Sequence, residues 1–373
     1  MLKVAFLIDS LDTGGVEMVL LNYIKGLSKY KHIELKVITN NKKETYLKGE
    51  LLRYVPVLHL KPHELPLKIG FINKLYTSFV RKKNLQKHLK NIDVIVDFLD
   101  ADFSKYIKNN KAKKITFIHS SYKKLLERKK GISQKIKHYD VITTICNDMQ
   151  SEFSQMEPDL KQKSIMIYNP IDFNEIKKRS ESLDLDCRTE IKLINENYIL
   201  SVSRLDEATK DISSTLKAIK LLKEKGSLDF KFLILGDGQD SEQLKKLTAD
   251  LNIQEHVYFL GEKSNPYVWM KHANLLVHSS KQEGFCLVLA EALSVKCDVI
   301  ATDCPVGPRE ILKDGLYGDL CEVGNVEMLA DMIAKRVFDN TKKSASFKSD
   351  IYSIESSSEH FANILEKVKN DIN

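Results

Sequence analysis

Short apolar runs alternate along this chain with longer stretches of helical spacing, and the alternation occurs in two separate series. The runs end in polar or glycine-containing loops, and the stretches that follow repeat apolar residues every three or four positions. This order is typical of strand–loop–helix units, which assemble into a parallel sheet with its ligand site at the carboxyl ends of the strands. The runs lie at residues 4–8, 35–39, 93–102, 115–119, 141–145 and 165–168 in the first series, and at 198–204, 230–236, 257–261, 275–278 and 299–302 in the second.

Two domains are expected, because 373 residues exceed what one hydrophobic core usually organises. The tetrapeptide Asn169-Pro170-Ile171-Asp172 ends the first series, and the second series begins at Tyr198. We therefore predict an α/β protein with a first domain at residues 1–172 and a second at residues 173–350, each built around a parallel sheet. Helical spacing returns at residues 351–368.

Residues 275–293 combine an apolar run, a polar loop and an alanine- and leucine-rich helical pattern. Glu283 lies in the loop and Glu291 lies eight positions later, so the two carboxylates are expected at two depths of one cleft. The first N–H groups of the helix, near Phe285, Cys286 and Leu287, have no partner within the helix and favour an anion. A carboxylate beside such a site repels a phosphate and favours neutral hydroxyls. The helix start and Glu283 together therefore suggest a ligand that carries both groups, a sugar phosphate. Taken alone, either glutamate is more often a solvated surface residue.

Glu283, Gly284 and Phe285, followed after a seven-residue interval by Glu291, resemble the motif of the retaining glycosyltransferases of family 4. The resemblance extends over nearly the whole chain. It implies the GT-B fold, in which two Rossmann-like domains face each other across a cleft and a C-terminal helix, here within residues 351–373, crosses back to the first domain. It also implies that the first domain binds the acceptor and the second binds a nucleotide sugar. UDP is the expected nucleotide, and no other cofactor is expected.

Arg204 closes the first run of the second series, and Lys210 follows in the next loop. Two cations at a strand end form a plausible diphosphate clamp, although an isolated arginine and lysine are usually surface charges. The family has such a pair and uses it to hold the departing diphosphate. Its commonest spacing leaves four residues between the cations, whereas five separate them here, so Arg204 is the firmer assignment.

The first domain offers a glycine pair and a histidine. Gly14 and Gly15 follow the first strand and let the backbone pass close to a ligand, although a plain turn also explains them. The dinucleotide fingerprint Gly-x-Gly-x-x-Gly is absent there, which disfavours a two-domain dehydrogenase. His119 ends the run at residues 115–119, where a histidine is often only a polar strand cap. The resemblance implies that the glycine loop faces the donor diphosphate and the acceptor, and that His119 faces the donor sugar.

Further roles come from the resemblance alone. It implies that Gly261, Glu262 and Lys263 lie against the nucleobase, that Glu283 holds sugar hydroxyls and that Glu291 accepts hydrogen bonds from the ribose. No carboxylate pair has an obvious nucleophile and acid assignment. We therefore expect a front-face displacement in which the leaving phosphate takes the acceptor's proton. The segment Val306-Gly-Pro-Arg-Glu310 keeps the glutamate of the family's Gly-Gly-x-x-Glu but loses one glycine, which leaves the shape of that loop open.

Positive charge is concentrated in the first half of the chain. The net charge is +7, yet residues 1–175 hold 31 lysines and arginines against 19 acidic residues. Residues 61–90 contain eight of these cations and one acid, with Ile72, Leu75, Tyr76 and Phe79 on one helical face. This segment is expected either to meet an anionic membrane surface or to be an ordinary surface helix with its stripe in the core. Membrane contact would suit a lipid-linked glycan, lipopolysaccharide or capsule or O-antigen precursor as acceptor of a hexose or N-acetylhexosamine.

Two other functions fit parts of the sequence. Asp100-Ala101-Asp102 follows a strand and matches the Asp-x-Asp with which single-domain GT-A glycosyltransferases hold a divalent metal. Such three-residue matches are common in a chain rich in acids, and we predict no metal site. The basic first half also raises nucleic-acid binding, but no aromatic residues interleave its lysines and no zinc or helix-turn-helix pattern occurs, so no nucleic-acid partner is expected.

The termini and cysteines indicate the expected compartment. Residues 4–8 form a strand pattern without a small-residue cleavage site, so we expect no signal peptide, and no apolar stretch approaches the ~20 residues of a membrane span. The six cysteines form no Cys-x-x-Cys pair, which is typical of reduced core thiols. A cytoplasmic protein, peripheral on the inner membrane's cytoplasmic face, is expected.

Overall fold

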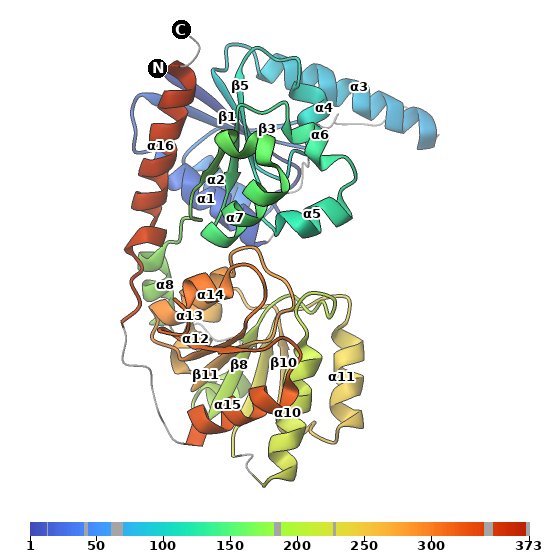
Figure 1. The fold of residues 1–373 in the computed structure, drawn as a ribbon, viewed down its shortest axis with the longest axis vertical. Helices are drawn as coiled ribbons and strands as arrows, with labels where there is room; N and C mark the ends of the chain where they lie inside the picture. Colours follow the sequence, from blue (N-terminus) through green and yellow to red (C-terminus); the bar gives the residue numbers. More distant parts are fainter. Residues whose placement is uncertain are drawn as a thin grey trace. The chain divides into compact units, whose positions relative to one another are not determined.

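The computed structural model divides the chain into two compact units. The first comprises Met1–Ile171 and Asp350–Asn373, and the second comprises Asp172–Ser349. The structure describes residues 1–12, 14–40, 44–60, 70–182, 188–226, 229–338 and 346–370, and within these the side chains of residues 70–75 and 188–189 are outside the description. Each unit has its own parallel sheet with helices between the strands (Figure 1), so the predicted α/β fold with two Rossmann-like domains is confirmed.

The first unit contains a seven-stranded sheet in the order β3-β2-β1-β4-β5-β6-β7, with every strand pair parallel. Its elements are β1 (Leu2–Ile8), α1 (Gly15–Leu27), β2 (Ile33–Thr39), α2 (Tyr46–Leu52), β3 (Val57–His59), α3 (Gly70–His88), β4 (Val94–Asp97), α4 (Ser104–Ile107), β5 (Lys113–Phe117), α5 (Tyr122–Arg128), α6 (Ile132–Ile136), β6 (Val141–Thr144), α7 (Asn147–Met156), the 3-10 helix η1 (Pro158–Lys163), β7 (Ser164–Met166), the 3-10 helix η2 (Asp350–Tyr352) and α16 (Ile354–Asn370). The strand order reverses between β1 and β4, which pair with Val4 opposite Val94.

The fourth strand is shorter than the apolar run at residues 93–102 predicts. β4 ends at Asp97, because Asp100 and Ala101 adopt left-handed backbone angles with φ of 48° and 57°. Two consecutive left-handed residues cannot continue a strand and turn the chain into α4.

The C-terminal helix returns to the first unit, as predicted. α16 runs beside α1 in Figure 1, and Phe361 of α16 packs on Phe6, Tyr23 and Phe117 with ring centroids 5.2–6.1 Å apart. Gly26 makes the close approach possible, because a Cβ there would lie 2.0 Å from Ser358 Oγ. The far end of α16 lies beside the N-terminus, where Lys369 Nζ donates to the Met1 carbonyl.

The second unit contains a six-stranded parallel sheet in the order β10-β9-β8-β11-β12-β13. Its elements are α8 (Phe173–Ser180), α9 (Arg188–Ile194), β8 (Tyr198–Val202), α10 (Ile212–Glu224), β9 (Lys231–Leu235), α11 (Ser241–Asp250), β10 (Val257–Gly261), α12 (Pro266–His272), β11 (Leu275–His278), α13 (Leu287–Ser294), β12 (Val299–Thr302), α14 (Pro308–Ile311), β13 (Asp319–Cys321) and α15 (Val326–Phe338). α10 and α15 contact each other beside the sheet, whereas α8, α12 and α13 form a second contacting group.

The strand order of the second sheet reverses between β8 and β11. The loops that leave two such neighbouring strands diverge to opposite faces of the sheet and open a crevice at its carboxyl edge. Buried apolar residues of the strands and of the helices beside them form the core of this unit, among them Ile199, Leu216, Phe232 and Val277. A ligand site of this unit is therefore expected at the carboxyl ends of β8 and β11.

Candidate functional site

The two segments predicted to bind the donor meet at the carboxyl edge of the second sheet, on either side of the reversal. Arg204 follows the end of β8 by two residues, and Lys210 lies farther along the same loop, before α10. Glu283 follows the end of β11 by five residues and precedes α13. Because β8 and β11 are adjacent, these loops lie side by side.

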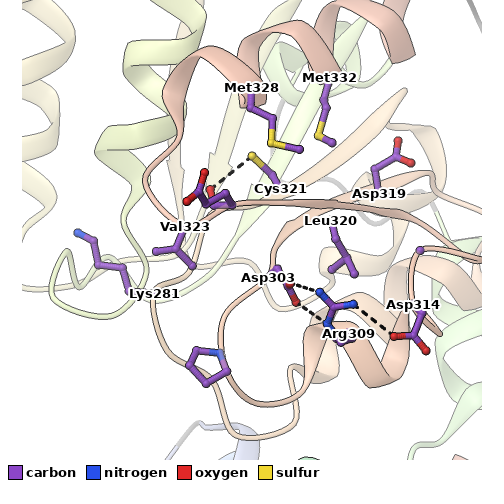
Figure 2. Close-up of a pocket in the computed structure, with 13 residues that line it drawn as sticks. Lys281, Asp303, Arg309, Asp314, Asp319, Leu320, Cys321, Val323, Met328 and Met332 are labelled. Carbon is purple, nitrogen blue, oxygen red and sulfur yellow. Dashed lines mark hydrogen bonds and ion pairs between the residues drawn. The ribbon is translucent and has the colours of Figure 1, made fainter.

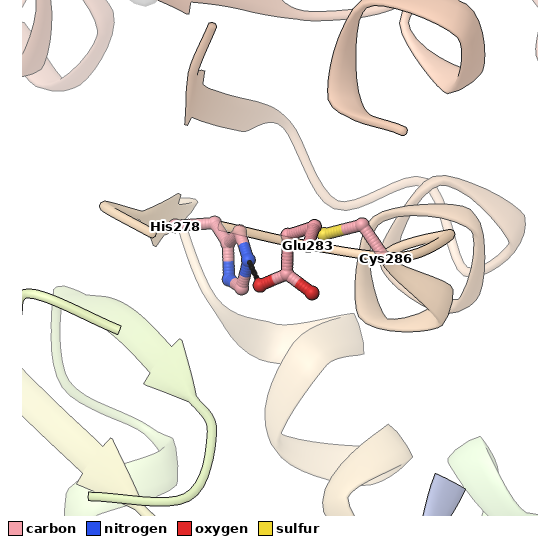
Figure 3. A group of neighbouring side chains, drawn as sticks. All are labelled: His278, Glu283 and Cys286. Carbon is pink, nitrogen blue, oxygen red and sulfur yellow. Dashed lines mark hydrogen bonds and ion pairs between the residues drawn. The ribbon is translucent and has the colours of Figure 1, made fainter. Parts of the chain in front are cut away.

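Glu283 is held by two basic side chains that contact the same carboxylate oxygen. Lys210 Nζ lies 2.5 Å from Glu283 Oε1, and His278 Nε2 lies 2.7 Å from it. Ser280 Oγ lies 2.9 Å from the same imidazole nitrogen. In Figure 3 the other carboxylate oxygen of Glu283 points away from His278. The side chains of Lys210, Glu283 and His278 are 19%, 10% and 3% exposed, so the cluster is largely shielded from water.

The Lys210–Glu283 pair is ionised at neutral pH. Burial raises the pKa of Glu283, but the Lys210 charge and the hydrogen bonds from Lys210 and His278 outweigh burial and hold the pKa well below its usual value. Burial likewise lowers the pKa of Lys210, and the Glu283 charge outweighs it, so the pKa of Lys210 is raised. The site therefore carries a fixed carboxylate and a fixed ammonium.

The start of α13 lies beside this pair. Cys286 caps the helix with a left-handed φ of 65°, and the helix begins at Leu287, within the residues 285–287 where the sequence predicts its first N–H groups. Phe285 and Cys286 are buried. Gly307, at φ 98°, packs under them, because a Cβ there would lie 3.0 Å from the Phe285 carbonyl oxygen. The single glycine of residues 306–310 thus supports the loop before α13.

His278, Glu283 and Cys286 form a group with metal-ligating atoms, all within 4.8 Å of one another (Figure 3). Imidazole, carboxylate and thiolate are the ligands that zinc takes in proteins. The Lys210 ammonium occupies the Glu283 oxygen, and burial raises the pKa of the Cys286 thiol well above its usual value, so the thiol is protonated. When no ion is bound, the lysine ammonium therefore takes the cation's place beside Glu283.

Arg204 is the exposed member of the predicted cation pair. Its side chain is 71% exposed, and its guanidinium lies 3.5 Å from Asp206. Its charge acts on Lys210, whose pKa it lowers against the larger effect of Glu283. The structure thus brings Lys210 and Glu283 into contact and leaves Arg204 accessible to a ligand nearby.

Glu291 belongs to a second cluster, which sequence reasoning did not find. The Tyr267 hydroxyl of α12 hydrogen-bonds the Glu291 carboxylate, and the Arg179 guanidinium of α8 lies 5.2 Å from the centre of the Tyr267 ring. Burial raises the pKa of Glu291 to about 7, against the hydrogen bond from Tyr267 and the charge of Arg179. No sequence signal marks Tyr267 or Arg179, because the three helices meet only through tertiary packing.

The segment predicted to lie against the nucleobase follows β10. Gly261 ends that strand with φ 70°, and its carbonyl accepts a hydrogen bond from the Gly236 N–H at 2.8 Å. Lys263 Nζ lies 2.5 Å from the Glu190 carboxylate of α9, and Glu262 is exposed. Lys263 therefore forms an ion pair with α9 when no ligand is bound.

In the first unit, Gly14 is the N-cap of α1 and Gly15 is the first residue of that helix. His119 follows β5 by two residues and packs against Phe98 and Phe117, with ring centroids 4.9 and 5.7 Å away. Burial lowers the pKa of His119 to about 4, so the imidazole is neutral at pH 7. A neutral imidazole can hydrogen-bond a sugar hydroxyl but cannot neutralise a phosphate.

The acidic pair of the metal-dependent alternative is engaged with cations of the same unit. Asp100 is buried and lies 3.3 Å from Arg128, and Asp102 pairs with Lys129. The fold also has two parallel sheets in two units, whereas the alternative needs a single GT-A domain. The GT-A prediction based on Asp100-Ala101-Asp102 is therefore not supported.

The basic segment falls partly outside the description, because residues 61–69 and the side chains of residues 70–75 are not described. In the remainder of α3, Phe79 is 67% exposed and Tyr76 is 39% exposed. Lys82, Lys83 and Lys87 are exposed on the same helix. The interpretation that this face packs into the core is wrong for Tyr76 and Phe79, while Leu85 is buried. Within the described part of the chain, no helix is both long enough and apolar enough to cross a bilayer.

A separate pocket of about 860 Å³ lies in the second unit, along β13 and the loop that follows β12 (Figure 2). Arg309 pairs with Asp303 and Asp314 on one wall, and Met328 and Met332 of α15 line another. None of the predicted site residues lines it. Each charged group of the Arg309 triad has a partner within the triad, so the pocket offers no unpaired charge from that wall.

The five described cysteines are free and buried, in agreement with reduced core thiols, and Cys187 lies outside the described residues. These thiols include Cys286 and Cys304, whose pKa values burial raises. Neither thiol is a candidate nucleophile, because the thiolate is the reactive form.

Relatives of the chain were found in both sequence and structure comparisons. A relative from Methanocaldococcus jannaschii, an uncharacterized glycosyltransferase, is 29% identical over 289 residues, 72% of this chain and 69% of the relative. The α-1,4-N-acetyl-D-galactosaminyltransferase of Campylobacter jejuni that is named for an undecaprenol-diphosphate-linked glycan is 27% identical over 322 residues, 85% of this chain and 84% of that protein. The crystal structure of Anabaena HepE with UDP-glucose has a TM-score of 0.75 at 18% identity and covers 100% of this chain and 98% of HepE.

Two family models match successive parts of the chain. Residues 13–175 match Glycosyltransferase Family 4, and residues 188–354 match Glycosyl transferases group 1. The first match falls on the first unit, and the second covers nearly all of the second unit. With two parallel-sheet units, the return of α16 and structural neighbours of the GT-B fold, these matches show that the chain belongs to the family 4 glycosyltransferases of the GT-B fold.

Proposed function

We propose that this protein is a retaining glycosyltransferase that moves a hexose or N-acetylhexosamine from a UDP-sugar to a lipid-linked glycan. The observation that carries the proposal is the shielded cluster of Glu283, Lys210 and His278 beside exposed Arg204, at the reversal of the second sheet. Family membership supports glycosyl transfer. The UDP-glucose complex of HepE supports the nucleotide, and the undecaprenol-linked substrate in the Campylobacter relative's name supports the acceptor class.

The leaving diphosphate is stabilised by positive charge that the fold has already placed. Arg204 offers a planar guanidinium to the phosphate oxygens, and Lys210 has three N–H donors, so it can hold Glu283 and a phosphate oxygen at once. The positive end of the α13 helix dipole adds a third source of positive potential. Preorganised donors of this kind typically contribute a factor of about 10² to 10³ each to turnover.

Glu283 binds the hydroxyls of the transferred sugar. Its carboxylate is ionised and held in place, so it accepts hydrogen bonds and stabilises the positive charge that develops at the sugar ring. Glu291 accepts hydrogen bonds from the ribose, next to the Tyr267 hydroxyl. His119 of the first unit, neutral at pH 7, hydrogen-bonds the donor sugar.

Retention is proposed because the chain belongs to a family named for it, and the state of Glu283 limits how retention could be reached. A carboxylate that is bound to Lys210 and His278 and has a depressed pKa is a poor proton donor and a weakened nucleophile. Retention without a covalent glycosyl-enzyme step requires the acceptor oxygen to bond to the anomeric carbon on the face from which the phosphate departs. As the bond from the anomeric carbon to the phosphate oxygen breaks, that oxygen takes the proton of the acceptor hydroxyl. The product keeps the donor's anomeric configuration.

Lysine and arginine charges replace a divalent metal in this scheme. The reaction is expected to proceed in excess chelator at an unchanged rate. If chelator abolished activity and Mn²⁺ restored it, a metal-dependent mechanism would replace the one proposed.

The first unit is proposed to meet an anionic membrane surface through α3, where the acceptor lipid is anchored. Phe79 and Tyr76 supply exposed aromatic surface, and three exposed lysines of the helix attract anionic headgroups. The protein would then be peripheral on the membrane's cytoplasmic face.

The test is a thermal-shift panel of UDP-, GDP- and ADP-sugars, followed by UDP release assays on variants. A ligand that binds only the folded protein raises the melting temperature as its concentration exceeds its Kd. UDP-sugars are expected to give the largest shift, and Arg204→Ala and Glu283→Ala to reduce turnover by about 10² or more. Lys246→Ala, an exposed position on α11, is the matched control. Near-normal turnover in both site variants, or binding of RNA but of no nucleotide sugar, would refute the proposal.

A further inference from the structure

The two oxygens of Glu283 have different surroundings. Lys210 and His278 both bind Oε1, at 2.5 and 2.7 Å, whereas the other oxygen points away from His278 in Figure 3. We propose that His278 is a positioning residue for sugar transfer, which fixes Oε1 of Glu283 so that Oε2 alone receives the donor sugar's hydroxyl. The inference rests on the proposed function and adds a residue to it.

His278 is well placed to hold a carboxylate in one orientation. It is the last residue of β11, its side chain is 3% exposed, and its backbone pairs with Ala301 of β12. Thr302 Oγ1 of β12 donates to the Ser280 carbonyl and so ties the loop after β11 to the neighbouring strand. A ring held this way presents its Nε2–H in a fixed direction.

Lys210 alone does not give the same control. An ammonium on a four-carbon stem binds an oxygen from many directions, and in the proposed reaction Lys210 must also meet the diphosphate. When the diphosphate also binds the ammonium, the hydrogen bond from His278 still fixes the rotation of the Glu283 carboxylate. Because Glu283 acts on the sugar and His278 affects the sugar only through Glu283, removing His278 should impair transfer without weakening UDP binding.

The experiment compares His278→Gln with His278→Met in the full-length protein. The amide nitrogen of glutamine reaches about as far as imidazole Nε2 and keeps a donor, whereas methionine has a similar length and no donor. Both variants are first checked for folding by thermal melting. Isothermal titration with UDP then measures nucleotide binding, and UDP release from UDP-N-acetylgalactosamine and UDP-glucose measures turnover. His272→Met, at an exposed histidine on α12, is the matched control.

The expected result is a kcat about 10- to 100-fold lower in His278→Met and within about threefold of the parent in His278→Gln, since a hydrogen bond to a charged group is lost in only one of them. The Kd for UDP should stay within about twofold in both. Equal turnover in the parent and His278→Met would overturn the inference, as would equal losses in both variants together with weaker UDP binding. A parent protein that neither binds UDP nor releases it from either sugar would instead refute the proposed function.

Discussion

Replacing Lys210 with methionine should destabilise the second unit, because it leaves the buried charge of Glu283 without its ammonium partner. Breaking a buried ion pair from one side costs about 3–5 kcal/mol. The side chain of Glu283 is 10% exposed, and the hydrogen bond from His278 remains, so we expect a somewhat smaller loss, about 2–4 kcal/mol. For a unit of this size, residues 172–349, that loss lowers the melting temperature by roughly 5–12 °C.

Glu283→Gln should partly rescue the loss. Glutamine has nearly the same shape and no charge, so in Lys210→Met/Glu283→Gln no charge remains buried. The double variant should be more stable than the sum of the single losses predicts by about 2 kcal/mol, a coupling typical of residues in contact. Trp269, the chain's only tryptophan, is buried in the second unit, so its fluorescence during urea unfolding reports on that unit.

The coupling should also depend on pH, with a sign fixed by the two pKa shifts. The pKa of Glu283 is lowered in the folded protein, so its contribution to stability is present above the unfolded value of 4.5 and is lost as pH falls below it. The pKa of Lys210 is raised, so its contribution is present below the unfolded value of 10.5 and is lost above it. Additive losses at pH 7, or a coupling that is as large at pH 3 as at pH 7, would refute this account of the pair.

Three further perturbations test other parts of the structure. Gly26→Leu should displace α16, whose Ser358 Oγ would lie 2.0 Å from the new Cβ, and limited proteolysis should then release the C-terminal segment. Glu291→Gln should gain about 2 kcal/mol over the parent between pH 5 and pH 8 in thermal melts, because a carboxyl with folded pKa of about 7 loses stability as pH rises from 4.5. Phe79→Ser should weaken sedimentation with phosphatidylglycerol vesicles about five- to tenfold, and Tyr46→Ser, at an exposed tyrosine on α2, should not.

The architecture could be predicted from the sequence because its signals are local. Apolar runs of four to seven residues and intervening amphipathic stretches give strands and helices, and parallel pairing with helical crossovers follows from that alternation. The end of β4 was one exception, and the three-residue edge strands β3 and β13, which no apolar run predicted, were two others. Nothing in the composition of residues 98–102 marks the left-handed angles of Asp100 and Ala101, which depend on the buried contacts of Asp100 with the His119 N–H and with Arg128.

Some contacts of the candidate site could also be predicted from the sequence, and others could not. The meeting of Lys210 and Glu283 could be predicted, because both follow strands that become neighbours once the sheet order is known. The partners of Glu291 could not, because Arg179 lies more than a hundred residues away on α8, a helix outside the strand alternation. His278 lies within residues 275–293, the stretch that contains both glutamates. A polar residue at a strand end gives no sign that it will bind Glu283.

Two glutamates of one short segment thus acquire opposite electrostatic states. Glu283 and Glu291 are both largely removed from water, and burial alone raises the pKa of each. Lys210, a buried ammonium in direct contact, reverses the effect at Glu283, whereas a neutral Tyr267 hydroxyl and a more distant Arg179 do not reverse it at Glu291. A carboxylate that stays charged suits the sugar, where positive charge develops during transfer. A carboxyl group that exchanges its proton near pH 7 can accept a hydrogen bond from a ribose hydroxyl in either state, in keeping with the role proposed for Glu291.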